Sequence, residues 1–199
     1  MSVDEYYNME LSRKSDINEH LPVLLELANE CETVTELGTR WVVSTWAFLK
    51  SSAKRITMCD LREPDFWHGK SDNPSPTPCK IADIEAAAPD KDIYFFKASS
   101  LDVEITDTDL LFIDTWHCYD QLKAELDKHA HAVNKYIVLH DVVLFKDVGE
   151  NFYGDHNRQY EGLQKAVDEF LEENKNWSVY QWHTNNNGLG VLKRKWTTK

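Results

Sequence analysis

Short apolar runs alternate along this chain with stretches in which apolar residues recur every three or four positions. Runs of this length, with little polar interruption, are typical of strands buried on both faces of a parallel sheet. The strand-like runs cover residues 34–38, 56–60, 93–96, 110–113 and 136–139. The clearest helical stripe consists of Leu163, Ala166, Val167, Phe170 and Leu171. The alternation predicts an α/β fold with a Rossmann-like, mostly parallel sheet and helices on both faces.

The C-terminal part of the chain predicts a different arrangement of strands. Two strand-like runs, 177–182 and 189–192, are separated by residues 184–188, which end in Asn-Gly. Asn-Gly between two such runs is a strong signal for a β-hairpin. We therefore expect a sheet of seven strands that ends in an antiparallel hairpin.

A single domain accommodates this pattern, because the 199 residues contain neither an internal repeat nor a linker. Two segments fall outside the pattern. Residues 1–14 are polar and predict an N-terminal arm or lid. Residues 64–79 predict a long loop over the ligand edge of the sheet, because proline is excluded from helix interiors and central strands. The prolines concerned are Pro64, Pro74, Pro76 and Pro78.

Two local patterns make sharper predictions about the helices. Asp16 and Glu19 have the spacing of a capping box, which predicts that a helix begins there. After the fourth strand, a helical stripe predicts a helix that continues to residue 133. The stripe consists of Leu122, Leu126, Ala130 and Val133. His129 and His131 lie in that helix, away from the ligand edge, and are expected on the solvated surface.

The charge balance and the cysteines exclude several classes of protein. The net charge of −12 leaves no basic surface for a phosphate backbone, so nucleic acid is not an expected partner. No apolar run reaches the about 18 residues of a membrane span, and residues 1–5 do not resemble a signal peptide. The four cysteines are scattered, as is usual for reduced thiols. We therefore expect a cytoplasmic protein with a small-molecule substrate and no membrane partner.

Acidic residues stand at the ends of four predicted parallel strands, namely Glu36, Asp60, Asp114 and Asp141. The C-terminal ends of parallel strands meet at one edge of the sheet, where open α/β sheets bind ligands. Asp60 follows Gly38 by about 20 residues, the spacing at which an acid accepts hydrogen bonds from ribose hydroxyls. These residues predict a cofactor that contains a nucleoside. The alternative for Asp60 is a structural role in which its carboxylate caps a turn.

The turn after the first strand indicates which nucleoside cofactor fits. Dinucleotides need a G-x-G-x-x-G turn, so that backbone N–H groups can approach the pyrophosphate. Residues 38–44 contain one glycine, Gly38, which is followed by the bulky Arg40 and Trp41. S-adenosylmethionine has no phosphate and does not require that approach, and Arg40 is placed to face its carboxylate. The turn therefore favours S-adenosylmethionine over a dinucleotide.

Four segments carry a resemblance to a known family: 35–45 (TELGTRWVVST), 112–122 (FIDTWHCYDQL), 136–141 (YIVLHD) and 184–192 (TNNNGLGVL). Together with the antiparallel end of the sheet, they resemble the class I S-adenosylmethionine-dependent methyltransferases over residues 15–195. Within that superfamily the chain is most similar to the small O-methyltransferase branch that includes cephalosporin hydroxylase-like proteins. It departs from the family's glycine-rich first motif at Arg40 and Trp41.

The resemblance implies which residues bind the cofactor. Glu36 and Gly38 would lie under it, Asp60 at the ribose and Ser99 near the adenine. The full set expected at the cofactor is Glu36, Gly38, Thr39, Arg40, Ser44, Asp60, Leu61, Ser99 and Asp114.

The resemblance also implies a metal site. In metal-dependent members of the branch, a divalent cation lies between an Asp after the fourth strand and an acidic pair after the fifth. The matching positions are Asp114 and the pair His140 and Asp141, which suit Mg²⁺ or another divalent cation. Without a metal, His117 or His140 would act as general base. The catalytic candidates are therefore Asp114, His117, His140 and Asp141.

The expected function is methyl transfer from S-adenosylmethionine to an oxygen of a small molecule, and the resemblance adds a metal-assisted form of this transfer. Such a transfer depends mainly on aligning the nucleophile, the methyl carbon and the sulfur. A non-catalytic cofactor-binding module with a methyltransferase fold is the alternative. A dinucleotide-using enzyme is disfavoured by the single glycine of the first turn.

Overall fold

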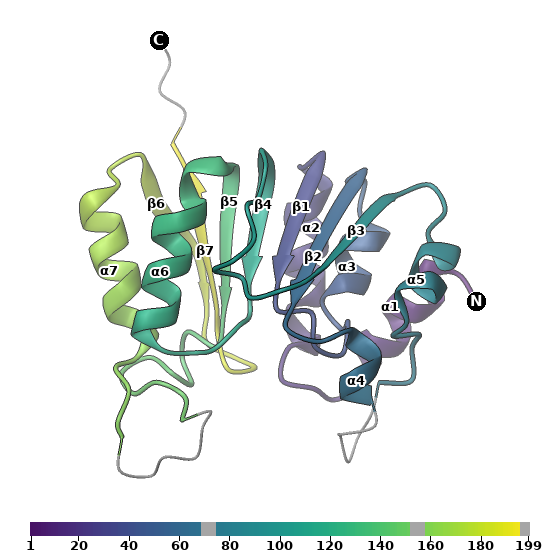
Figure 1. Ribbon diagram of the computed structural model, residues 1–199, viewed down its shortest axis with the longest axis horizontal. Coiled ribbons are helices and arrows are strands. Elements are labelled where there is room, and N and C mark those ends of the chain that lie inside the picture. Colours follow the sequence, from purple (N-terminus) through teal and green to yellow (C-terminus); the bar gives the residue numbers. More distant parts are fainter. Residues whose placement is uncertain (69–74, 152–157, 196–199) are drawn as a thin grey trace.

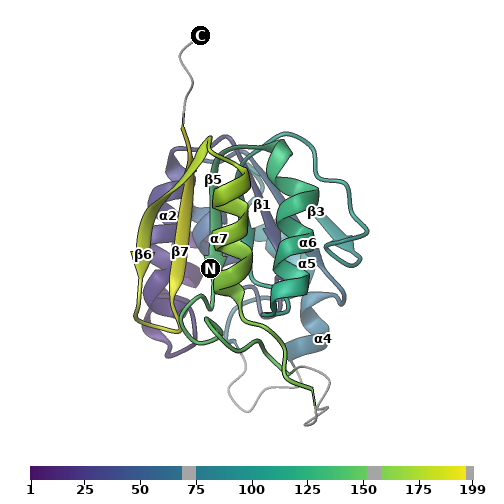
Figure 2. The ribbon, with the colours of Figure 1, turned by 90° about the vertical axis from the view of Figure 1, so that its left-hand side faces the viewer.

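The computed structural model describes residues 1–68, 75–151 and 158–195. Its centre is one seven-stranded sheet with helices on both faces (Figures 1 and 2). Five strands run parallel, and β7 runs antiparallel to both of its neighbours. In sheet order the strands are β3 (Asp92–Lys97), β2 (Arg55–Asp60), β1 (Thr33–Leu37), β4 (Thr108–Ile113), β5 (Val133–His140), β7 (Leu189–Arg194) and β6 (Trp177–His183). The predicted sheet and its C-terminal hairpin are confirmed.

Two separate cores lie on the two faces of the sheet, because successive side chains of a strand point to opposite sides. In β4, Leu110 and Phe112 belong to one core, and Leu111 and Ile113 belong to the other. The first core is covered by α1 (Val3–Ser12), α2 (Leu21–Asn29), α3 (Thr45–Lys50) and α5 (Ile81–Ala87). The second is covered by α6 (Tyr119–His129) and α7 (Leu163–Glu173).

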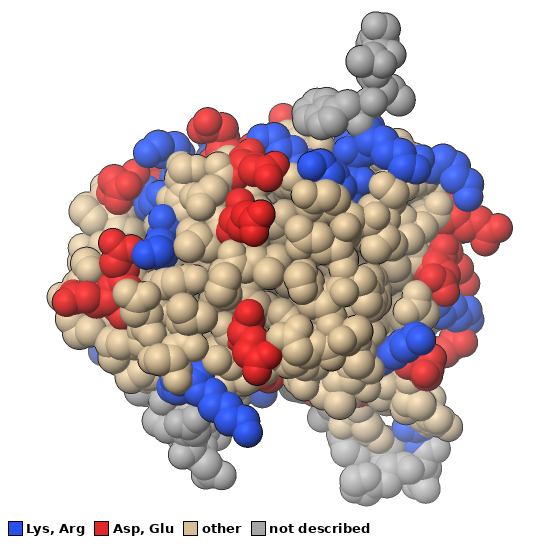
Figure 3. Space-filling model, turned by 180° about the vertical axis from the view of Figure 1, so that it is seen from behind, with Lys and Arg blue, Asp and Glu red and all other residues tan. Residues whose placement is uncertain are grey.

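The outer surface on the side of the first core carries few charges over its centre. Figure 3 shows this side, where a group of Lys and Arg residues gathers along the edge at the top of the view. The parallel strands of Figure 1 point to the opposite, lower edge. Within the described residues, no helix has the length and apolar character needed to cross a membrane.

The N-terminal residues form a packed helix and not a free arm, which corrects the sequence-based expectation. Ser2 and Glu5 make a capping box at the start of α1. The ring of Tyr6 packs on Trp46 of α3 at a centroid distance of 4.7 Å, and Tyr7 is buried. The capping box expected at Asp16 and Glu19 does not form. The reciprocal bonds join Ser15 and Asn18 instead, at the start of a 3-10 turn (Asn18–His20) that leads into α2.

The helix after β4 is shorter than predicted. It ends at His129, a 3-10 turn (Ala130–Ala132) follows, and Val133 already belongs to β5. His129 is not on the surface: it is 1% exposed, and its Nε2 lies 2.8 Å from the carbonyl oxygen of Ser100. His131 is exposed, as expected.

The proline-rich segment has more structure than the sequence suggested. Pro64 begins the short helix α4 (Pro64–His68), because proline fits the first turn of a helix. Residues 69–74 of the predicted loop lie outside the described residues. Beyond them, the hydroxyl groups of Ser75 and Thr77 donate to the buried carboxylate of Glu10 in α1, which ties this segment to the first core.

Candidate active site

The parallel register brings the ends of four strands to one edge of the sheet. Leu37 of β1 pairs with Cys59 of β2 and with Ile113 of β4, and Ile113 pairs with Leu139 of β5. The residues that directly follow these pairs are therefore neighbours. They include most of the site residues predicted from the sequence, and they divide into a β4–β5 half and a β1–β2 half.

His117 is the centre of the β4–β5 half. Its Nε2 lies 3.0 Å from Asp114 Oδ1 and 3.1 Å from Asp141 Oδ2, and its Nδ1 lies 3.0 Å from Glu150 Oε2. The ring stacks on Phe145, with centroids 5.1 Å apart and planes 3° from parallel. Burial lowers the pKa of His117, but the hydrogen bonds to Asp114 and Glu150 outweigh burial and raise the pKa to about 10.

His140, the last residue of β5, approaches the same carboxylates from inside the sheet. It is 2% exposed, and its Nδ1 lies 3.3 Å from Asp114 Oδ1 and 3.7 Å from Asp141 Oδ2. Its Nε2 lies 3.1 Å from the carbonyl oxygen of Asp16, so Nε2 carries a hydrogen. Burial lowers the pKa of His140, but the charge of Asp114 outweighs burial and raises the pKa to about 9.

The two carboxylates respond differently to this environment. Burial raises the pKa of Asp114, but the charge of His140 and the hydrogen bond from His117 outweigh burial and hold the pKa far below its ordinary value. Burial raises the pKa of Asp141, and here it is the dominant effect. Asp141 Oδ1 is buried and has no hydrogen-bond partner among the described residues. The backbone of Asp141 is left-handed, with φ 61°, which is strained for a residue other than glycine.

The three residues that the sequence assigned to a metal lie together. One ligand atom from each of Asp114, His140 and Asp141 falls within 4.8 Å of the other two. Two carboxylates and an imidazole are a donor set that divalent cations accept. The fourth catalytic candidate, His117, touches both carboxylates, so the structure brings all four into one cluster.

At Gly38 the backbone of the β1–β2 half approaches the backbone of the β4–β5 half closely. Its φ is 88°, and a Cβ added there would lie 2.0 Å from the backbone oxygen of Asp114. The rest of the turn has no glycine, yet Arg40 (φ 41°) and Val42 (φ 58°) are also left-handed. A β-branched residue in this conformation is a genuine outlier. Such strain is often found at binding sites.

Asp60 serves this turn through its carboxylate. Oδ2 accepts hydrogen bonds from the N–H groups of Thr39 (3.1 Å) and Arg40 (2.9 Å), and Oδ1 accepts from the N–H of Arg62 (3.0 Å). The structural alternative for Asp60 is therefore present in the molecule. Leu61, the next residue, is 62% exposed beside it. The ribose role of Asp60 stays a prediction.

Glu36 and Ser44 lie below the ligand edge. Glu36 is fully buried, and its two oxygens accept hydrogen bonds from the hydroxyl groups of Ser44 (2.5 Å) and Thr45 (2.7 Å). Burial raises the pKa of Glu36 to about 8. Both carboxylate oxygens of Glu36 thus bind the start of α3, so Glu36 supports the turn from beneath.

The other residues predicted at the cofactor have different exposures. The Thr39 hydroxyl is buried without a hydrogen-bond partner among the described residues. The Arg40 side chain is 55% exposed, and its Nη1 lies 3.7 Å from Asp16 Oδ2. Ser99 is half-buried, and its Oγ accepts a hydrogen bond from the N–H of Leu101 at 3.2 Å.

Glu150 and Phe145 were not anticipated from the sequence. Both lie in the long connection after β5, where no periodic pattern or known spacing marks a residue as functional. Glu150 also anchors this connection beyond its side chain, because its carbonyl oxygen accepts the indole N–H of Trp116 at 2.9 Å. A contact across 33 positions becomes visible only in three dimensions.

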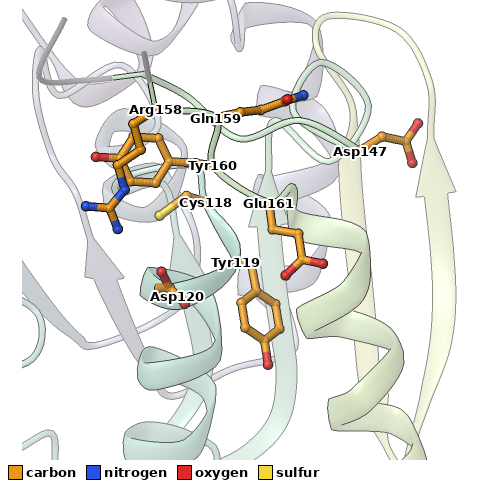
Figure 4. Close-up of a pocket in the computed structure, with 8 residues that line it drawn as sticks. All are labelled: Cys118, Tyr119, Asp120, Asp147, Arg158, Gln159, Tyr160 and Glu161. Atoms are coloured by element: carbon orange, nitrogen blue, oxygen red, sulfur yellow. The ribbon is translucent and has the colours of Figure 1, made fainter. Parts of the chain in front are cut away.

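A cavity of about 430 Å³ lies beside the cluster, between the start of α6 and residues 158–161 (Figure 4). The ring of Tyr160, which lines it, packs edge-on against Trp116 at 4.9 Å, one residue from His117. Its lining is polar, with three acids (Asp120, Asp147 and Glu161) and one cation, Arg158. The lining residues are Cys118, Tyr119, Asp120, Asp147, Arg158, Gln159, Tyr160 and Glu161.

No family model and no curated protein matches this chain. Solved structures do. An O-methyltransferase from Bacillus cereus in complex with S-adenosylhomocysteine has a TM-score of 0.60 at 14% identity, covering 97% of this chain and 90% of its own. The Burkholderia thailandensis 1,6-didemethyltoxoflavin-N1-methyltransferase, solved with S-adenosylhomocysteine and its acceptor, has a TM-score of 0.59 at 11% identity, covering 92% and 80%. A methyltransferase from Geobacter sulfurreducens has a TM-score of 0.55 at 12% identity, covering 97% and 84%. The chain therefore has the class I methyltransferase fold.

Proposed function

We propose that this chain transfers a methyl group from S-adenosylmethionine to a hydroxyl oxygen of a small molecule. The observation that carries the proposal is the meeting of Asp60, Asp114, His140 and Asp141 at one edge of a methyltransferase-type sheet. Two proteins of the same fold, from Bacillus cereus and Burkholderia thailandensis, were solved with S-adenosylhomocysteine. The N1 acceptor named for the second one shows that the fold also serves nitrogen, so oxygen is the finer part of the proposal.

The residues of the β1–β2 half fit a nucleoside without a pyrophosphate. A carboxylate offers about four lone-pair positions, and Asp60 uses three of them for backbone N–H groups. One position remains for a ribose hydroxyl. Leu61 provides an exposed apolar surface for a base, and the Arg40 guanidinium, which is 55% exposed beside Asp16, can meet a carboxylate. The buried Thr39 hydroxyl would gain a partner from a ligand in this turn.

The β4–β5 half fits a divalent cation, because the unpartnered oxygen of Asp141 lies in a set of oxygen and imidazole donors. Asp114, His140 and Asp141 would hold the ion. When bound, a divalent cation lowers the pKa of an acceptor hydroxyl and orients it.

The proton of the acceptor hydroxyl has to pass to the chain. In the metal-free protein His117 already carries a proton at neutral pH, since its pKa is raised to about 10, so it donates and does not act as the base expected from the sequence. Asp141 Oδ1 has no donor among the described residues, and burial raises the pKa of this carboxyl. In the form without a metal, we assign the acceptor proton to Asp141 Oδ1.

The first test is calorimetry with S-adenosylmethionine and S-adenosylhomocysteine. We expect both to bind, and Asp60→Ala to weaken binding at least tenfold, because it removes the ribose acceptor and three turn hydrogen bonds. Asp127→Ala, at an exposed position of α6, is the matched control and should bind as the wild type does. If the wild type gives no binding signal at millimolar ligand, the result would instead support the alternative of a non-catalytic module with a methyltransferase fold.

A further inference from the structure

We propose that β3 is a dimerisation surface, at which a second copy of this chain adds its own β3 in antiparallel orientation. The two sheets would then continue into one another across a two-fold axis that passes beside Phe95. Tyr94 of each chain would lie opposite Phe96 of the other. The inference does not rest on the proposed function, because it concerns an edge strand of the sheet and not the cluster of acids and histidines.

Tyr94 and Phe96 expose aromatic surface on one face of β3, where they are 51% and 47% exposed. Phe96 pairs with Cys59, which belongs to the second core, so both rings point to that side of the sheet. The helices that cover the second core, α6 and α7, lie over the other end of the sheet (Figure 1). The connection from β3 to β4, residues 98–107, forms no helix. The two rings therefore belong to neither core and are left uncovered.

The outer edge of β3 presents unpaired backbone groups along the strand. β3 is the end strand of the sheet, and β2 is its one neighbour among the described strands. The N–H groups of Asp92 and Ala98 both donate to carbonyl oxygens on the β2 side. Because the direction alternates along a strand, Ile93, Phe95 and Lys97 point their N–H and C=O groups outward. An edge of this kind is a template for another strand.

The strand at the opposite edge, β6, is protected in two ways. Its register with β7 shifts between Val179 and Gln181, and such bulges interrupt pairing at an edge. The exposed ring of Tyr180 is covered by Lys193, whose Nζ lies 4.5 Å from the ring centroid. In contrast, β3 pairs with β2 over its whole length without a shift. The regular strand β3 is therefore the edge that accepts a second copy.

The outward-pointing groups select the register. In an antiparallel pair, residues that exchange both hydrogen bonds alternate with residues that exchange none. With the axis at Phe95, this residue faces its own copy, and Ile93 faces Lys97, as hydrogen-bonded pairs. Tyr94 then lies opposite Phe96 as a non-hydrogen-bonded pair, the type with closer side chains. This register pairs all the outward-pointing residues and both exposed rings, and cross-strand aromatic pairs stabilise a sheet.

The charges at the ends of β3 favour the same arrangement. Asp92 begins the strand, Lys97 ends it, and both are exposed. Antiparallel pairing brings the acidic end of each strand beside the basic end of the other, whereas parallel pairing would bring like charges together. Lys97 Nζ also lies 3.4 Å from Glu63 Oε1, in an exposed ion pair that contributes little. The ends of β3 are thus complementary to those of a second copy.

The test is analytical ultracentrifugation of the full chain over a range of concentrations. We expect the 23.2 kDa chain to associate into a species of twice that mass. Phe96→Lys places a charge at the centre of the interface and should weaken association at least about tenfold. Val179→Lys, at a side chain of β6 that is 49% exposed, is the matched control and should associate as the wild type does.

Circular dichroism shows whether the two lysine variants fold. A wild type that stays monomeric up to millimolar concentration would overturn the inference. Equal association of the wild type and folded Phe96→Lys would do the same, as would a loss of association in Val179→Lys alone.

Disulfide cross-linking tests the register separately. A mixture of Tyr94→Cys and Phe96→Cys chains should form a cross-linked dimer on oxidation, because the two positions lie opposite one another. Each variant by itself should cross-link far less, since a residue and its own copy are then offset along the strands. Both variants would also carry Cys79→Ser, because the Cys79 side chain is partly exposed. Cross-linking of one variant alone as strong as in the mixture, or none in the mixture, would contradict the proposed pairing.

Discussion

The two halves of the ligand edge use similar residues in opposite ways. In the β4–β5 half, Asp114 and Asp141 converge on two histidines, and one oxygen of Asp141 has no hydrogen-bond partner within the described part of the chain. In the β1–β2 half, both oxygens of the Glu36 carboxylate accept from hydroxyl groups, and the Asp60 carboxylate accepts from three backbone N–H groups. The acids of the first half contact side chains at the ligand edge, whereas those of the second mostly hold the backbone and the start of α3.

This difference shows that an acid at a strand end marks a location and does not establish a role. Glu36 and Asp114 are acids near the ends of adjacent strands, although Glu36 pairs with Phe112 and Asp114 comes two positions later. Yet the Asp114 side chain is 24% exposed and Glu36 is fully buried. The residue after a strand leaves the pleat and reaches the edge, whereas two positions earlier, inside the strand, the side chain still belongs to a face of the sheet.

The largest effect is expected at the contact between the halves. Gly38→Ala would place a Cβ 2.0 Å from the backbone oxygen of Asp114 in a left-handed backbone, so both halves must separate. We expect the free energy of unfolding to fall by about 3 kcal/mol or more, measured by urea denaturation.

Gly190→Ala is the matched control for this substitution. Its added Cβ would meet only the ring of Trp182, at 2.6 Å, and its backbone is not left-handed. A side chain can turn away more cheaply than backbone can move, so the loss should be smaller. Equal losses in the two variants would mean that the close approach at Gly38 does not join the halves.

The second prediction concerns the charges of the β4–β5 half. In the metal-free protein the pKa values of His140 and His117 are raised to about 9 and about 10, from about 6.5 in the unfolded chain. A raised pKa stabilises the folded state fully below the unfolded value, and this stability is lost as the pH rises through the folded value. Between pH 6.5 and 9.5 we therefore expect the free energy of unfolding to fall by about 1–3 kcal/mol.

Urea denaturation in chelator at a series of pH values measures this loss. His140→Gln removes one of the two titrating groups, so its stability should depend less steeply on pH than that of the wild type. His131→Gln, at the solvated histidine, should keep the wild-type slope. Parallel curves for the wild type and His140→Gln would show that the cluster does not carry a buried imidazolium pair.

The same comparison explains what could be predicted from the sequence. The strands and the terminal hairpin follow from apolar runs and the Asn-Gly signal, and the strand-end rule located Asp114, His140 and Asp141. Glu150 and Phe145 escaped prediction, because they reach His117 through a long connection whose path depends on the whole fold. The two halves contain the same types of residue and differ in the groups that their acids contact. Tertiary packing determines these contacts.

The smallest effect is expected in the strained turn of the β1–β2 half. A left-handed backbone costs about 1–2 kcal/mol in a residue other than glycine, so Arg40→Gly would remove this strain. Two effects oppose the gain: glycine increases the conformational entropy of the unfolded chain, and the stacking of Arg40 on Trp41 is lost. We expect a net gain of about 0.5 kcal/mol by urea denaturation, together with weaker binding of S-adenosylmethionine in calorimetry, because the guanidinium can no longer meet its carboxylate. Arg40→Asn separates the effect of the backbone from that of the guanidinium, because asparagine also tolerates a left-handed backbone. Like the glycine variant it lacks the guanidinium, so the two variants should have the same affinity for the cofactor. If instead both variants bind the cofactor as tightly as the wild type, Arg40 serves only the turn, and the β1–β2 half contributes little more than Asp60 to recognition.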